Sequence, residues 1–208
     1  MIAELIGALA ASVFGIFTVF KKRTPLFYRI VFFAFLTCLM GNIYTALYIW
    51  LWPQDQSGFH VGYLGYMGTF FFLYSSYYGA INSLADGGQS EFNRHRIASC
   101  LVSAAFFIVS VIMIAILDKG FWLLIVVVPI CLTLYFALKL LIIPDVEMGV
   151  IKVMRPYNAL ILALCVFMLI RLSSPADSAP ETVGSISSAL LIAISLPAAR
   201  NGVRKWFT

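Results

Sequence analysis

The chain has 208 residues, of which 62% are hydrophobic and only 11% are charged. Soluble domains carry about 25% charged residues, so this composition excludes an ordinary water-soluble protein. Apolar runs of about 18 residues or more recur along the sequence, as is typical of helices that cross about 30 Å of hydrocarbon. The first expected partner is therefore the lipid bilayer.

The net charge of +5 does not indicate nucleic-acid binding. Lysines and arginines lie at the ends of the apolar runs rather than along one face, so membrane orientation explains them, and we expect no nucleic-acid partner. The four cysteines lie inside apolar runs and have no CxxC spacing. We therefore expect neither a disulfide nor a metal site.

Seven apolar runs predict an all-α fold, a seven-transmembrane helix bundle that forms a single domain over residues 1–208. The links between the runs are too short to hold a soluble domain. The charged triplet Asp118-Lys119-Gly120 divides one long run into two helices, because it offers the turn that such a length requires. The predicted spans are 2–20, 27–52, 61–84, 98–117, 120–143, 156–172 and 183–199.

The first span is predicted to be a retained helix with its N-terminus outside. No basic residue precedes it and Lys21-Lys22-Arg23 follows it, which is the reverse of a signal peptide. Small residues spaced by four share one stripe of this helix, and such a stripe allows a neighbouring backbone to come close. The stripe consists of Ala3, Gly7, Ala11 and Gly15.

The second and third spans carry an unusual number of hydroxyl groups for a membrane segment. Because a short link joins these two antiparallel helices, we expect them to touch. At about 100° per residue, Tyr63, Tyr66, Phe70, Tyr74 and Tyr77 share one face of the third span, and its glycines share another. An unpaired hydroxyl in hydrocarbon costs several kcal/mol, so these tyrosines should face protein or a wet cavity.

We expect a binding cavity for a small neutral ligand between the second and third helices, open toward the outer face. In this hypothesis Asn42 and Tyr74 lie at the same depth. The alternative is that these hydroxyls and amides only bridge helices and bind nothing. The candidate ligand-binding residues are Asn42, Thr45, Tyr48, Tyr63, Tyr74 and Tyr77.

The remaining spans show which kinds of chemistry the sequence does not indicate. Glu4, Arg29, Lys139 and Arg171 lie near span ends, where they can snorkel, so no buried ionisable group suggests an ion-coupled transporter. The last span has no lysine for retinal, and no nucleophile–base pair can be identified. The topology places His60 and His95 on opposite sides of the membrane, so they cannot share a metal. We expect no enzyme and no cofactor.

Prolines and basic residues define the geometry of the spans. Pro129 and Pro197 should kink or end their helices. With the N-terminus outside, twelve lysines and arginines lie on the cytoplasmic side and two, Lys119 and Arg171, lie outside, which fits the positive-inside rule. The twelve are Lys21, Lys22, Arg23, Arg29, Arg94, Arg96, Lys139, Lys152, Arg155, Arg200, Arg204 and Lys205.

These patterns favour a non-enzymatic sensor or ligand-binding protein of a plasma membrane, most simply a bacterial one. Without a soluble output domain, such a protein would signal through a partner membrane or cytoplasmic protein. The alternatives are a facilitative transporter or channel for a small neutral solute, and a membrane scaffold or assembly subunit. The scaffold would be favoured if the small-residue stripe of the first span faced lipid.

Overall fold

The computed structural model describes residues 2–21, 24–52, 59–82, 86, 89–144 and 149–207. Of the residues used for orientation, Lys22 and Arg23 lie outside the described part. The described residues form an all-α bundle of seven long helices and no strand. These helices are α1 (Ile2–Val19), α2 (Leu26–Leu51), α3 (Gly62–Ser76), α5 (Asn93–Ile116), α6 (Leu124–Ile142), α7 (Val150–Ser173) and α8 (Ala179–Phe207).

Short helical segments complete the long helices. The π-helix η1 (Tyr77–Asn82) continues α3 directly, and the 3₁₀ turns η2 (Ser90–Phe92) and η3 (Phe121–Leu123) precede α5 and α6. Six of the seven long helices are long and apolar enough to cross a bilayer, and α3 is the exception because its α-helical part has only 15 residues. The chain is therefore a multi-pass membrane protein.

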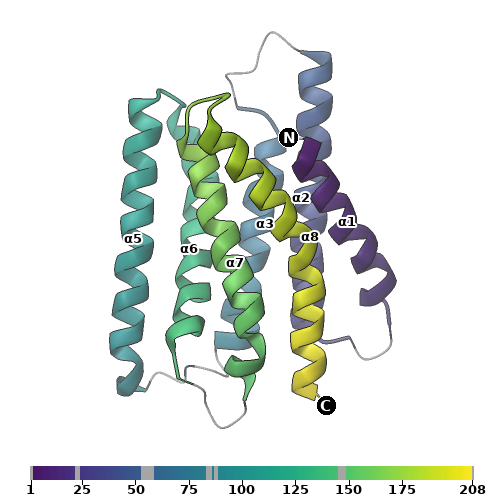
Figure 1. Cartoon of the computed structure of the whole chain (residues 1–208), viewed down its shortest axis with the longest axis vertical. Coiled ribbons are helices and arrows are strands. Elements are labelled where there is room, and N and C mark those ends of the chain that lie inside the picture. Colours follow the sequence, from purple (N-terminus) through teal and green to yellow (C-terminus); the bar gives the residue numbers. More distant parts are fainter. Residues whose placement is uncertain are drawn as a thin grey trace.

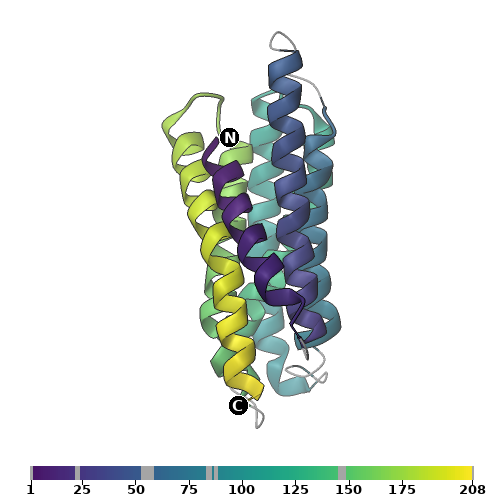
Figure 2. The same ribbon diagram turned by 90° about the vertical axis from the view of Figure 1, so that its right-hand side faces the viewer.

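The helices run up and down between two ends of the bundle. We call the end that holds the start of α1 the upper end, and the opposite end, where α8 finishes, the lower end (Figure 1). The predicted turn after α5 is confirmed, since Asp118 and Gly120 both adopt positive φ angles of 49° and 83°. In the view turned by 90°, α1 crosses the bundle between α2 and α8 (Figure 2).

Glycines bring the backbones of α2 and α3 into direct contact, as predicted from the glycine face of the third span. A Cβ placed on Gly65 would lie only 2.3 Å from the Cα of Gly41, and one on Gly62 would lie 2.9 Å from the Gly41 carbonyl oxygen. This contact leaves no room for a cavity between the two backbones at the level of Gly41 and Gly65. A ligand-binding cavity between helices 2 and 3 therefore stays a prediction, and any space for it lies above this level.

The small-residue stripe of α1 also packs against neighbouring helices. A Cβ on Gly7 would lie 2.3 Å from the carbonyl oxygen of Ala189 in α8, and Gly15 is covered by Phe32 of α2 and Leu196 of α8. Gly7, Ala11 and Gly15 are buried within the bundle. Because the stripe is already covered, the observation that would have favoured a scaffold subunit is absent.

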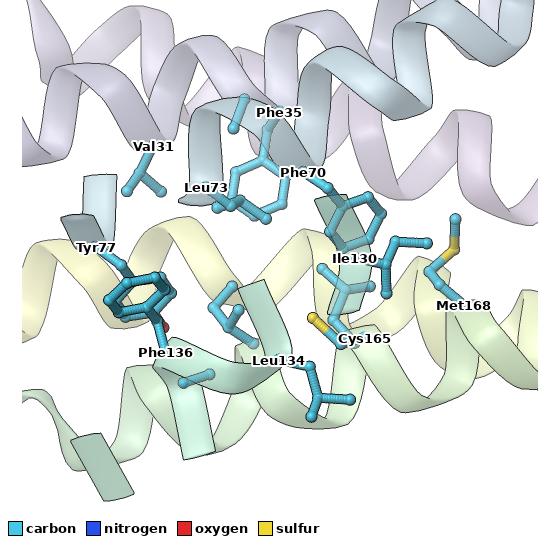
Figure 3. Packing of buried hydrophobic residues seen from close by; sticks show 14 of the residues in the cluster. Val31, Phe35, Phe70, Leu73, Tyr77, Ile130, Leu134, Phe136, Cys165 and Met168 are labelled. Atoms are coloured by element: carbon cyan, nitrogen blue, oxygen red, sulfur yellow. The ribbon is translucent and has the colours of Figure 1, made fainter. Parts of the chain in front are cut away.

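The interior between α2, α3, α6 and α7 is filled by large apolar side chains. Figure 3 shows Phe35, Phe70, Leu73, Ile130 and Leu134 packed against one another, and all of them are at most 1% exposed. Such packing resembles the interior of a soluble protein, in which voids larger than a water molecule are rare.

Pro129 and Pro197 lie inside their helices and do not end them. Pro197 lies inside α8, which continues to Phe207, and Figure 1 shows this helix bending along its length. Pro129 lies in the second turn of α6. The hydroxyl oxygen of Thr133 lies 2.8 Å from the Pro129 carbonyl oxygen and 3.0 Å from the Phe70 carbonyl oxygen of α3, and its single proton can be donated to either. This side chain therefore ties the proline-containing turn to α3.

At the lower end, a buried group of charges joins α6 to the segment between α3 and α5. Lys139 was expected to snorkel, but it is 2% exposed. Its ammonium lies 3.0 Å from the carboxylate of Asp86 and also donates to Asn82, while Arg96 pairs with the same carboxylate. Asp86 lies between two predicted spans, and its side chain is only 4% exposed. A buried cation needs a paired anion, and Asp86 supplies it.

Candidate functional site

A buried ion pair lies near the upper end of the bundle. Arg171, in the last turn of α7, places a guanidinium nitrogen 2.6 Å from a carboxylate oxygen of Glu4, in the first turn of α1. Glu4 is fully buried, and the Arg171 side chain is 17% exposed. Both residues were expected to reach the membrane surface, but they form an ion pair inside the protein instead.

Tyr66 of α3 and Asn42 of α2 extend this pair into a polar network. The Tyr66 hydroxyl lies 3.0 Å from Glu4 Oε2 and 2.9 Å from Asn42 Oδ1, and its single proton can be donated to either oxygen. The guanidinium carbon of Arg171 lies 5.3 Å from the centre of the Tyr66 ring, which is a cation–π distance. Four helices, α1, α2, α3 and α7, therefore meet through one set of side chains.

The ion pair borders a cavity that consists of two adjoining hollows of about 420 and 560 Å³. We call both together the upper cavity. Four residues line both hollows, namely Tyr63, Arg171, Asp177 and Glu181. The cavity thus lies between the α2–α3 pair on one side and the end of α7 with the start of α8 on the other.

One wall of the upper cavity carries a row of four aromatic rings. His60 stacks on Tyr48 with ring centres 4.9 Å apart, and Tyr63 lies 4.3 Å from His60. Trp122 of η3 lies 4.3 Å from Tyr63 on the other side. We call Tyr48, His60, Tyr63 and Trp122 the aromatic row. Rings of this kind offer both an apolar surface and polar edges to a ligand.

The opposite wall is charged. Asp177 and Glu181 accompany Arg171 in both hollows, and the second hollow adds Asp118 and Lys119. The Lys119 ammonium donates to the carbonyl oxygens of Leu172, at 3.2 Å, and of Ser174, which neutralises the carbonyl end of α7. The expected uncharged lining therefore does not describe this cavity.

Burial perturbs two titratable groups beside the cavity. The pKa of His60 is lowered because burial disfavours the charged imidazolium. The pKa of Lys119 is also lowered, mainly by burial and further by the positive charge of Arg171, while the negative charge of Glu181 acts in the opposite direction. Both effects favour the neutral forms at the upper end.

The six predicted ligand-binding residues separate into two groups. Thr45, Tyr48 and Tyr63 line the upper cavity. Asn42 lies beneath it, fully buried, and reaches it only through Tyr66.

The other two predicted residues lie deeper in the bundle. The Tyr77 hydroxyl donates to Asn158 of α7 at 3.1 Å, in the fully buried interior. The ring of Tyr74 packs against Phe136 at 5.6 Å and Tyr78 at 5.9 Å. The residue at the depth of Asn42 is Tyr66, so the expected level of Tyr74 is wrong by eight residues, or about 12 Å of helix.

The charged wall is the part of the site that sequence reasoning missed. A usable signal was present: Glu4 lies at the start of a span predicted to begin outside, Arg171 was predicted to lie outside as well, and residues of opposite sign in a membrane pair with one another. His60 was considered only as a metal ligand together with His95, and not as part of a cavity wall. No protein-family model, curated protein or solved structure matches this chain.

Proposed function

We propose that the protein is a seven-span, non-enzymatic membrane receptor that binds a small polar ligand in the upper cavity at the outer face. The N-terminus lies outside and the C-terminus lies in the cytoplasm. The observation that carries the proposal is the upper cavity itself, which is lined both by the aromatic row and by Arg171, Asp177 and Glu181. Cavities with apolar rings and a few convergent polar groups are typical of small-molecule sites.

The arrangement of the helices supports the orientation. The two ends of the chain lie at opposite ends of the bundle, as an odd number of crossings requires (Figure 1). The basic residues of α5, α7 and α8 begin or finish their helices at the lower end, whereas Arg171 and Lys119 lie at the upper end. With the lower end in the cytoplasm, this distribution follows the positive-inside rule.

Binding is favoured over passage because the bundle is filled beneath the cavity. Asn42 and Tyr66 are fully or nearly fully buried there, and Phe70 and Leu73 fill the next turns of α3. A solute that reached the cavity would have to displace this packing to cross the membrane. A receptor that passes no solute signals through a partner protein, which responds to a change in the arrangement of the helices.

The proposal is tested by thermal unfolding of the purified protein in detergent with a panel of small polar solutes. At least one solute should raise the melting temperature, and Tyr63→Ala should abolish that shift. Tyr74→Ala is the matched control, because Tyr74 does not line the upper cavity, and it should preserve the shift. If no solute stabilises the protein, the binding function is wrong.

Liposome flux separates a receptor from a facilitative carrier. Proteoliposomes should show no specific uptake of the stabilising solute. Uptake that is abolished by Asn42→Ala, beneath the cavity, would replace the receptor with a carrier.

A further inference from the structure

We propose that the upper cavity recognises a zwitterion, a small molecule that carries both a carboxylate and an ammonium group, as free amino acids do. This inference rests on the proposed ligand-binding function and names the class of ligand. It replaces the neutral ligand expected from sequence, because that expectation assumed that no ionisable side chains were buried near the cavity.

Arg171, Asp177 and Glu181 line the same cavity, and among the described residues no ion pair joins Arg171 to either of these two carboxylates. Arg171 is paired with Glu4 instead. The carboxylates and the guanidinium therefore face one space across a gap. A neutral ligand would leave both signs to water, and a singly charged ligand would satisfy only one of them.

Arg171 is suited to hold the carboxylate of such a ligand. A guanidinium has five N–H donors in a planar fork that matches a carboxylate, and the contact with Glu4 leaves some of them available. Glu4, Tyr66 and the end of α7 fix the position of the guanidinium, so little freedom is lost on binding. Arg171 also lines both hollows.

The ammonium group of the ligand finds two kinds of partner. Asp177 is an exposed carboxylate in a left-handed conformation with φ 57°, just before α8. Glu181 accepts a hydrogen bond from the Asp177 backbone nitrogen at 2.6 Å, which holds its carboxylate at the mouth of the cavity. The aromatic row supplies ring faces, and a cation over such a face is further stabilised.

A matched set of probes isolates the charge requirement. L-alanine and L-phenylalanine are each compared at pH 7 with their amides, which keep only the ammonium, and their N-acetyl derivatives, which keep only the carboxylate. The N-acetyl amides keep neither charge. Isothermal titration calorimetry in detergent should give at least tenfold tighter binding for one of the two zwitterions than for each of its three analogues.

Two conservative variants assign the two charges to their residues. Arg171→Lys keeps a cation opposite Glu4 but loses the planar set of N–H donors. It should therefore weaken the binding of the zwitterion and of the N-acetyl form about tenfold and leave the binding of the amide unchanged. Asp177→Asn keeps the shape and tolerates the left-handed backbone. This variant should weaken the binding of the zwitterion and of the amide and leave the binding of the N-acetyl form unchanged. Glu91→Gln, an exposed charge at the lower end, is the control and should change nothing.

Failure of this inference is distinguishable from failure of the proposed function. If an amide, an N-acetyl form or a neutral analogue binds as tightly as its zwitterion, the ligand class is wrong while ligand binding stands. The same holds if none of these probes binds but another solute of the panel stabilises the protein through Tyr63. If nothing binds at all, both proposals are overturned.

Discussion

The buried pair of Glu4 and Arg171 gives the sharpest prediction for stability. Arg171→Gln leaves the carboxylate of Glu4 in the interior without its cation, and Glu4 is fully buried. Removing one partner of a buried ion pair costs about 3–5 kcal/mol, because the remaining charge stays desolvated. Glu4→Gln should cost a similar amount, since Arg171 then loses its anion.

The double variant Glu4→Gln with Arg171→Gln should cost much less than the sum of the two single changes. Two neutral amides can still bond to each other and to Tyr66, whose hydroxyl already lies 3.0 Å from Glu4. We expect a coupling free energy of at least about 2 kcal/mol. Because both residues lie inside the bundle, the pair should contribute more than the value of about 0–1 kcal/mol that is typical of exposed ion pairs.

The assay is reversible unfolding of the protein in mixed micelles, followed by circular dichroism and tryptophan fluorescence. All four proteins of the double-mutant cycle are measured at the same lipid composition and at two salt concentrations. Because the pair is shielded, the coupling should change little with salt. Purely additive single-mutant costs, or a cost below about 1 kcal/mol for Arg171→Gln, would refute a structural role for the buried pair.

Three further predictions follow from packing, titration and topology. Gly65→Ala should lower the free energy of unfolding by about 1–3 kcal/mol, because the added Cβ would lie 2.3 Å from a backbone atom of Gly41. In the same assay Gly68→Ala should be neutral or stabilising, because the nearest atom to its Cβ is 3.5 Å away. The pKa of His60 is lowered, so the folded state binds fewer protons than the unfolded state and the free energy of unfolding should fall as the pH drops below about 6.5. If the melting temperature of His60→Gln drops between pH 7.5 and 5.5 by as much as that of the unmodified protein, this prediction is wrong. Cysteine introduced at Ala176 should react with a membrane-impermeant maleimide in intact cells and cysteine at Ser90 should not, and the reverse pattern would invert the proposed orientation.

The positions of the helices along the chain could be predicted from the sequence, because a bilayer imposes the length and the apolar composition of helices that cross it. The prediction was less accurate where other forces set the ends. α8 continues to Phe207 rather than ending at 199, since its last turns carry basic residues that suit a helix C-terminus. α7 begins at Val150 rather than 156, after Gly149 with φ 64°, and so contains Pro156 in its interior.

The candidate site could be predicted only where chain neighbours form it. Thr45, Tyr48 and Tyr63 line the upper cavity together because a short link holds α2 beside α3, and their role in ligand binding stays a prediction. The facing wall comes from α7 and α8, and hydropathy does not specify which distant helices meet. α1 likewise contacts α7 through Glu4 and α8 through Gly7, and the sequence of α1 alone does not specify these two neighbours.

The salt bridges of Asp86 limit how this protein can be engineered. A fluorescent reporter is usually inserted into a connecting segment on the assumption that such a segment is a passive tether. Here one carboxylate holds Lys139 of α6 and Arg96 of α5 at once. A fusion that displaced Asp86 would leave the buried ammonium of Lys139 without its anion. A reporter is therefore better attached after the end of α8.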